Sequence, residues 1–99
     1  MTTLVNILTV DPAKQAQLLD MLRDNTDSVV STLDDWISTD LIASADGACV
    51  VIHSRWRNPA AVDAMRSDPR MVAYFPRLAA LARFDSIIGS VIHTKGRTS

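Results

Sequence analysis

The chain has little cysteine, little glycine and no excess of basic residues, and each shortage excludes a class of protein. One cysteine among 99 residues excludes an intramolecular disulfide. Three glycines, with no glycine-rich turn between a strand and a helix, provide no phosphate-binding loop. The formal net charge is −1, and Lys and Arg are spread along the chain, so no basic surface for nucleic acid or an anionic membrane is predicted.

Long apolar runs are also missing, and no leader sequence is expected. The longest apolar stretches, such as "ACVVI", are far shorter than the roughly 20 residues of a membrane-spanning helix. The start "MTTLVNILTV" has neither a basic leader nor a small-residue cleavage site, so we expect a soluble cytoplasmic protein. At 47% hydrophobic and 21% charged, the composition predicts one globular domain over residues 1–99, with a core of about 3–94 and a polar C-terminal tail.

Strand and helix signals alternate along the chain. The β-branched run "TLVNILTV" predicts a strand that ends at Asp11-Pro12, and apolar spacing of three and four predicts a helix from Pro12 to about Ser31. Two further β-rich runs are joined at Asp46-Gly47, which favours a hairpin of strands near 35–44 and 48–56.

The second half repeats this order. Asn58-Pro59 and Asp68-Pro69 are cap-then-proline signals, and the second helical region is expected in two pieces, with Pro76 as a kink or break. "FDSIIGSVIH" predicts a last strand, and "TKGRTS" a frayed tail. The order βαββαβ is typical of the α+β ferredoxin-like fold, an antiparallel sheet with helices on one face.

Both faces of this sheet carry apolar side chains. In the first strand, Leu4 and Leu8 oppose Val5 and Ile7. At roughly 25 cal/mol per Å² of apolar surface, leaving one sheet face exposed to water costs several kcal/mol of stability. We therefore expect a homodimer packed sheet to sheet; the alternative is a monomer whose long last strand or tail folds over that face.

Two polar side chains stand out on the strands. Asn6 shares a face with Leu4 and Leu8, and a buried amide must hydrogen-bond either the backbone or a ligand. Trp56 shares a face with Val50 and Ile52, so it is either an end-of-core aromatic or a pocket donor.

Other candidates have weaker support. Tyr74 lies one turn before Arg77 on the second helical region, where both could reach a cleft, and Arg83 is assigned to the same region. Cys49 and His53 share a strand face about 13 Å apart, too far for a nucleophile–base pair. No further Cys/His cluster supports a metal site.

Three stretches carry a resemblance to a known family. "VNILTVDPAK" with its Asn, "VVIHSRW" ending in Trp, and the following "NPAAVDAM" together resemble the antibiotic biosynthesis monooxygenase family, small dimeric α+β-barrel proteins, over about residues 3–94. The resemblance implies oxidation of phenolic or polycyclic aromatic polyketides to quinones, with molecular oxygen as co-substrate and without metal, flavin or haem. The implied partners are an aromatic small molecule and a second copy of the chain.

The resemblance also implies site residues. Asn6 and Trp56 match the family's pocket Asn and Trp, which would donate hydrogen bonds to substrate or peroxide oxygens, and Arg77 is the nearest match to a helix arginine of the polyketide-oxidising members. With these three as catalytic candidates, the substrate-binding wall is expected to include Ile52, Met65, Tyr74 and Phe75.

The chain departs from the family pattern at two places. Polyketide-oxidising members carry an additional Asn at the position of Ile52, and Tyr74 could substitute for it. Haem-degrading members and quinol monooxygenases have a histidine near the positions of Met65 and Arg66, so haem ligation is not supported. Two other functions stay open: a polyketide cyclase or isomerase on the same fold, and a non-catalytic ligand-binding protein.

Overall fold

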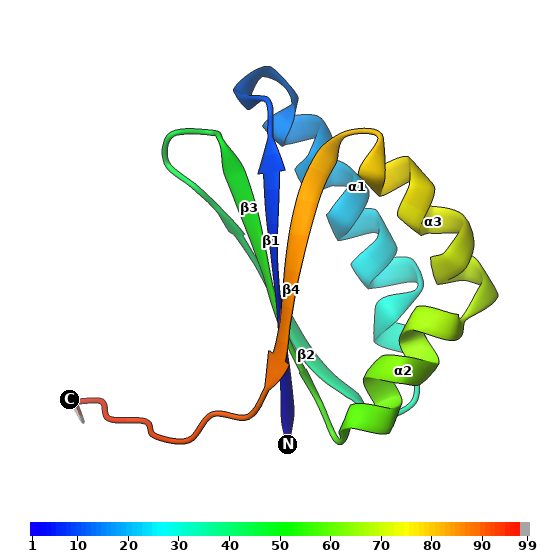
Figure 1. The fold of residues 1–99 in the computed structure, drawn as a ribbon, viewed down its shortest axis with the longest axis vertical. Coiled ribbons are helices and arrows are strands. Elements are labelled where there is room, and N and C mark those ends of the chain that lie inside the picture. Colours follow the sequence, from blue (N-terminus) through cyan, green and yellow to red (C-terminus); the bar gives the residue numbers. More distant parts are fainter. Residues whose placement is uncertain (98–99) are drawn as a thin grey trace.

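The computed structural model describes residues 1–97. It consists of one antiparallel sheet and helices that all lie on one side of that sheet (Figure 1). The four strands are β1 (Thr2–Val10), β2 (Trp36–Ala43), β3 (Cys49–Trp56) and β4 (Ala82–Gly89), in the sheet order β2-β3-β1-β4. The helices are α1 (Gln15–Ser28), α2 (Pro59–Ser67) and α3 (Pro69–Ala79), with short 3-10 turns at Pro12–Lys14 and Val30–Thr32. This confirms the predicted α+β ferredoxin-like fold. No helix in residues 1–97 combines the length and apolar character needed to cross a bilayer.

Each predicted cap-then-proline signal begins a helical segment. In each case the side chain of the cap accepts a hydrogen bond from a backbone N–H of the first turn, which has no partner inside the helix. The pairs are Asp11 with Ala13 at 2.9 Å, Asn58 with Ala61 at 2.9 Å, and Asp68 with Arg70 at 2.8 Å. The hairpin at Asp46-Gly47 is also confirmed, with Gly47 at φ 78°, where a side chain would be strained.

The second helical region is divided at Asp68, and the prediction of a break at Pro76 is wrong. Pro76 lies inside α3, which continues to Ala79. A proline there removes only the hydrogen bond to the carbonyl of Val72, and Val72 is 54% exposed, so water can reach that turn. The assignment of Arg83 to this helical region is also wrong, because Arg83 lies in β4.

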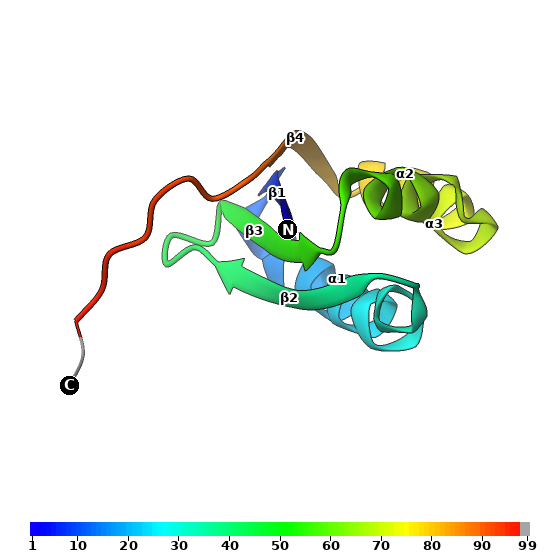
Figure 2. The same cartoon turned by 90° about the horizontal axis from the view of Figure 1, so that it is seen from below.

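The last strand is shorter than predicted. It pairs with β1 only from Ala82, opposite Val10, to Gly89, opposite Thr3. β1 begins at Thr2, so only one of its residues remains beyond the pair of Gly89 with Thr3, and Val91 and Ile92 leave the sheet at 61% and 98% exposure. Figures 1 and 2 show the rest of the tail extending away from the body. Of the tail "TKGRTS", Thr98 and Ser99 lie outside the described residues.

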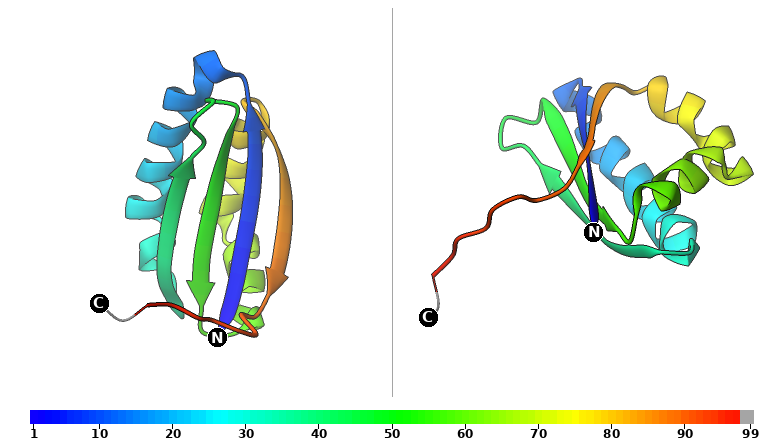
Figure 3. Two further views of the ribbon diagram at one scale, coloured as in Figure 1. Left: turned by 90° about the vertical axis from the view of Figure 1, so that its left-hand side faces the viewer. Right: turned by 60° about the horizontal axis from the view of Figure 1, so that its bottom comes forward.

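The core lies between the helices and one face of the sheet. Leu4, Leu8, Val50 and Trp56 are at most 2% exposed on that face, as the alternation predicted. From the helices, the core receives Leu18, Leu22, Val62, Met65, Met71, Tyr74 and Leu78. In the part of the chain that the structure describes, no helix covers the opposite face (Figure 3).

Candidate active site

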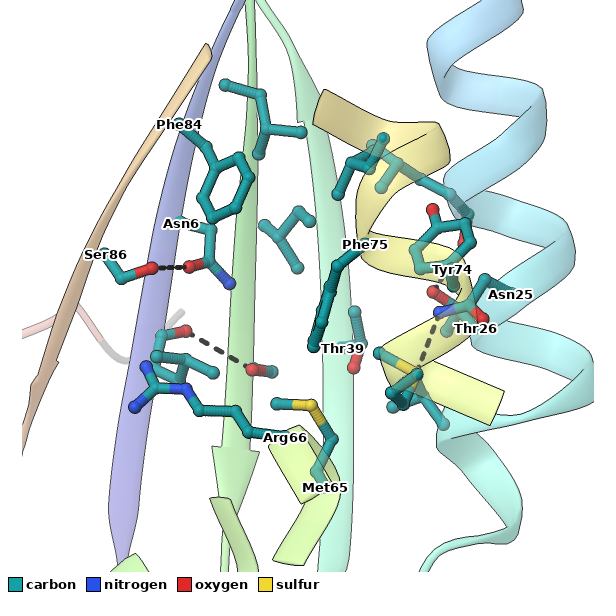
Figure 4. A pocket seen from close by; sticks show the side chains of 18 of the residues that line it. Asn6, Asn25, Thr26, Thr39, Met65, Arg66, Tyr74, Phe75, Phe84 and Ser86 are labelled. Atoms are coloured by element: carbon teal, nitrogen blue, oxygen red, sulfur yellow. Dashed lines mark hydrogen bonds between the residues drawn. The ribbon is translucent and has the colours of Figure 1, made fainter. Parts of the chain in front are cut away.

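A cavity of about 310 Å³ opens between the sheet and the three helices (Figure 4). This volume is at the lower end of the range of about 300–1,000 Å³ that is usual for ligand pockets. The lining is mostly apolar side chains with a few polar groups. Six of the seven residues predicted for the site line it: Asn6, Ile52, Trp56, Met65, Tyr74 and Phe75.

Asn6 is positioned by the neighbouring strand. The register of β1 against β4 places Ser86 opposite Asn6, and the Ser86 hydroxyl donates a hydrogen bond to Asn6 Oδ1. With its oxygen held in this way, the amide has its Nδ2 group turned into the cavity (Figure 4). Nδ2 donates to no other side chain or backbone group of residues 1–97, so it is a preorganised donor for a ligand oxygen.

Trp56 forms a wall of the cavity, and its N–H already has a partner. The side chain is 1% exposed, and Nε1 donates to Ser54 Oγ at 3.0 Å. Ser54 Oγ in turn donates to the backbone carbonyl of Leu4 at 3.3 Å. The family resemblance implies an indole N–H that donates to a substrate or peroxide oxygen, whereas in this structure the N–H donates to Ser54.

Tyr74 lines the cavity, and its hydroxyl is buried in the protein. It is 8% exposed, and its hydroxyl has no hydrogen-bond partner among residues 1–97. Burial raises the pKa of the Tyr74 phenol to about 12, an effect that the nearby Arg77 guanidinium opposes. The phenol is therefore neutral at neutral pH and is able to donate a hydrogen bond. A buried donor without a partner costs about 1–3 kcal/mol.

Arg77 is the one predicted site residue that the structure does not bring to the cavity. It is exposed in the last turn of α3 and is not among the lining residues. The arginine that does line the cavity is Arg66, at the end of α2. Figure 4 shows its side chain stretching from α2 toward β1, at the same end of the cavity as Asn6 and Ser86.

The remaining polar lining groups were not predicted, and most of them are engaged with the protein. Trp36 Nε1 donates to Thr39 Oγ1 at 2.9 Å, Thr26 Oγ1 donates to the Leu22 carbonyl, and Asn25 Nδ2 contacts Met71 Sδ at 3.5 Å. Asn25 and Thr26 interrupt the apolar pattern of α1, which was the available sequence signal. Ser86 had no such signal, because its role depends on the strand register.

The acidic and imidazole groups lie elsewhere. His53 Nδ1 and Asp40 Oδ2 are 3.5 Å apart on the sheet face that no described helix covers. In residues 1–97, no three or more His, Cys, Asp or Glu side chains come together as a possible metal site. The cavity lining contains no carboxylate and no imidazole. Among residues 1–97, this lining can bind an apolar ligand and polarise its oxygen atoms, and it offers no carboxylate or imidazole as a general base.

Comparisons with known proteins agree with this geometry. The family model for the antibiotic biosynthesis monooxygenase matches residues 1–77. Tetracenomycin-F1 monooxygenase from Streptomyces glaucescens is 35% identical over 97 residues, which are 98% of this chain and 87% of that protein.

Two solved structures have the same fold. ActVA-Orf6, a monooxygenase from Streptomyces coelicolor whose crystal structure holds nanaomycin D, superposes with a TM-score of 0.89 at 20% identity, covering 98% of this chain and 92% of that one. SnoaB, a cofactor-independent oxygenase from Streptomyces nogalater, superposes with a TM-score of 0.79 at 19% identity, covering 94% of each chain.

Proposed function

Because the chain belongs to the antibiotic biosynthesis monooxygenase family, we propose that it is a cofactor-independent oxygenase that converts a phenolic or polycyclic aromatic polyketide to a quinone. The observation that carries the proposal is the largely apolar cavity, in which the Asn6 Nδ2 group is a free donor. Tetracenomycin-F1 monooxygenase, similar over nearly the whole chain, supports the aromatic substrate class.

The lining can support this chemistry without a resident cofactor. The substrate itself supplies the electrons: the anion of an electron-rich phenol passes them to dioxygen, and loss of water from the peroxide gives the quinone. The protein has to exclude bulk water and place donors where oxygen atoms gain negative charge. Asn6 serves the reacting oxygens, and the wall is formed by Ile52, Met65, Tyr74, Phe75 and the Trp56 ring.

Oxygen uptake tests this proposal. We expect purified, chelator-treated protein to consume dioxygen with an anthrone in a ratio of one dioxygen per quinone formed, with one water released. An oxygen electrode and the quinone absorbance measure the two quantities in the same sample. Heat-treated protein gives the background rate of autoxidation. Uptake no faster than this background with several anthrones and hydroxynaphthalenes would overturn the oxygenase and favour a cyclase, an isomerase or a binding protein.

We also propose that the active form is a homodimer packed through the open sheet face. That face carries Ile7, Ile42 and Ile87 at 39%, 53% and 63% exposure, together with Val5 and Val51. The tail extends away from this face instead of covering it, which disfavours the monomeric alternative (Figure 1). A second copy of the chain is the occupant because it presents the same apolar strands, which a two-fold axis makes self-complementary.

A charge on the open face is expected to separate the dimer. Ile87→Asp places a carboxylate on an exposed position, so the single chain still folds while the interface loses an apolar contact and gains a buried charge. Light scattering at micromolar concentration should give the mass of two 10.8 kDa chains for the wild type and of one for I87D. Val72→Asp, at 54% exposure on α3, is the matched control and should stay dimeric. A wild-type mass equal to that of one chain would contradict the proposed dimer.

A further inference from the structure

We propose that Arg66 is the substrate-binding cation of this cavity, which holds the bound phenol or enol as its anion. The inference rests on the proposed function, and it names a residue and a requirement on the substrate: an ionisable hydroxyl must lie at the Asn6 and Ser86 end of the cavity. On this reading Arg66 takes the role that the family resemblance would have given to Arg77.

The first observation is that Arg66 carries the only formal charge in the lining at neutral pH. Tyr74 is the one other lining side chain that titrates, and its raised pKa keeps it neutral. A guanidinium beside an otherwise apolar cavity favours an anionic ligand, because an opposite charge within about 4–6 Å stabilises the charged form of a phenol. Neither Asn6 nor Tyr74 can supply a charge.

The second observation is that the Arg66 side chain points toward β1 and is not held by a carboxylate. Figure 4 shows Arg66 extending from α2 toward β1 and the Asn6–Ser86 pair. Two other arginines, Arg57 and Arg70, are held by carboxylates, at 3.0 Å from Asp35 and 3.1 Å from Asp68.

Arg66, by contrast, forms no ion pair within residues 1–97. A basic residue in the last turn of a helix also interacts favourably with the helix dipole, but that role does not require the side chain to line a cavity.

The charged groups near Arg66 do not neutralise its guanidinium. On its own helix, Asp63 is exposed one turn earlier, and across the α2–α3 junction Asp68 is already paired with Arg70. From α3, Tyr74 is the only cavity-lining residue that titrates. The strands β1 and β4 present no titratable group on the cavity side, since Asp85 points to the opposite face from Ser86. No carboxylate is therefore positioned in the cavity to neutralise the guanidinium or to remove a substrate proton.

The ionisation step follows from this arrangement. The O–H bond of the bound phenol breaks, the electron pair stays on the oxygen beside Arg66, and the proton passes to water. Arg66 is exposed, so it lies at the mouth of the cavity where water is present to accept that proton. The step needs no protein base, which is consistent with a lining that has neither a carboxylate nor an imidazole.

The test is a spectrophotometric pH titration of bound alizarin, a hydroxyanthraquinone dye that is already a quinone and changes from yellow to red-violet when its phenol ionises. We expect the apparent pKa of the dye to be lower by about 1 on the wild type than on Arg66→Gln, a modest shift because the guanidinium is partly exposed. Arg66→Lys keeps a cation and should retain most of the shift. Arg23→Gln, which removes an exposed arginine of α1 outside the lining, should titrate like the wild type.

Two outcomes count against the inference, and they are distinguishable. If the dye binds wild type and R66Q and titrates at the same pH on both, Arg66 does not hold the anion, and the oxygenase proposal stands. If the dye binds to no variant, the cavity is not an aromatic site, and the proposed function fails together with the inference. Circular dichroism of R66Q confirms that the exposed substitution leaves the fold intact.

Discussion

Replacing Asn6 with alanine is expected to slow oxygen uptake by about 100-fold, the usual loss when one preorganised donor is removed from an oxyanion site. The reason is the geometry of the amide, whose oxygen accepts from Ser86 and whose Nδ2 is left to the ligand. The substitution removes a half-buried polar group, so the stability of the sheet should change little. The measurement is kcat in the oxygen electrode at saturating anthrone, with urea unfolding in parallel.

Ser86→Ala separates positioning from donation. It removes the hydroxyl that holds Asn6 Oδ1 and leaves the donor itself in place, so we expect a smaller loss, of about tenfold, shared between kcat and KM. Ser90→Ala, just beyond the end of β4 and outside the cavity lining, is the control for a serine change in the same region and should behave like the wild type. An unchanged kcat in N6A would dismiss Asn6 as the oxyanion donor.

Local chemistry made the fold predictable from the sequence. The caps at Asp11, Asn58 and Asp68 fix where helices begin, because each supplies an acceptor for the first turn. Alternation along β1 and β3 groups Asn6 with Leu4 and Trp56 with Val50, and the structure shows that this face is the one covered by the helices. The ends of elements were harder to predict, since β4 stops within one residue of the end of its partner strand β1 and not where its apolar residues end.

The cavity could be predicted only in part. Ile52, Met65 and Phe75 follow from strand and helix phase, but the contact between Ser86 and Asn6 joins residues 80 positions apart and depends on register. The choice between Arg66 and Arg77 depends on how α2 and α3 are divided. The helix turns direction at Asp68 instead of Pro76, and this places Arg66 at the mouth of the cavity and Arg77 on the outer surface.

The two interpretations of Trp56 predict different effects of its substitution. A core aromatic affects mainly the stability of the fold, and a pocket donor affects mainly the oxygenase rate. Trp56→Ala should lower the free energy of unfolding by about 3–5 kcal/mol, because a side chain that is 1% exposed leaves a void behind it. For a domain of this size that is a large part of a total stability of about 5–15 kcal/mol. Urea unfolding measures the loss, and Phe84→Ala, an aromatic in the lining at 45% exposure, should lose much less.

Trp56→Phe then isolates the indole N–H. Because Nε1 donates to Ser54 and Ser54 also donates to the Leu4 carbonyl, the hydroxyl keeps one partner when the N–H is removed. We expect the free energy of unfolding to fall by about 1 kcal/mol and the oxygenase rate to fall less than tenfold, well short of the loss in N6A. A 100-fold loss of kcat in W56F at unchanged stability would contradict this, and it would mean that the indole leaves Ser54 for a substrate oxygen during turnover. Ser54→Ala, which frees the indole N–H, distinguishes the two cases again. The oxygenase rate should rise if the reaction uses the indole N–H. The rate should stay unchanged if Trp56 only forms a wall of the cavity.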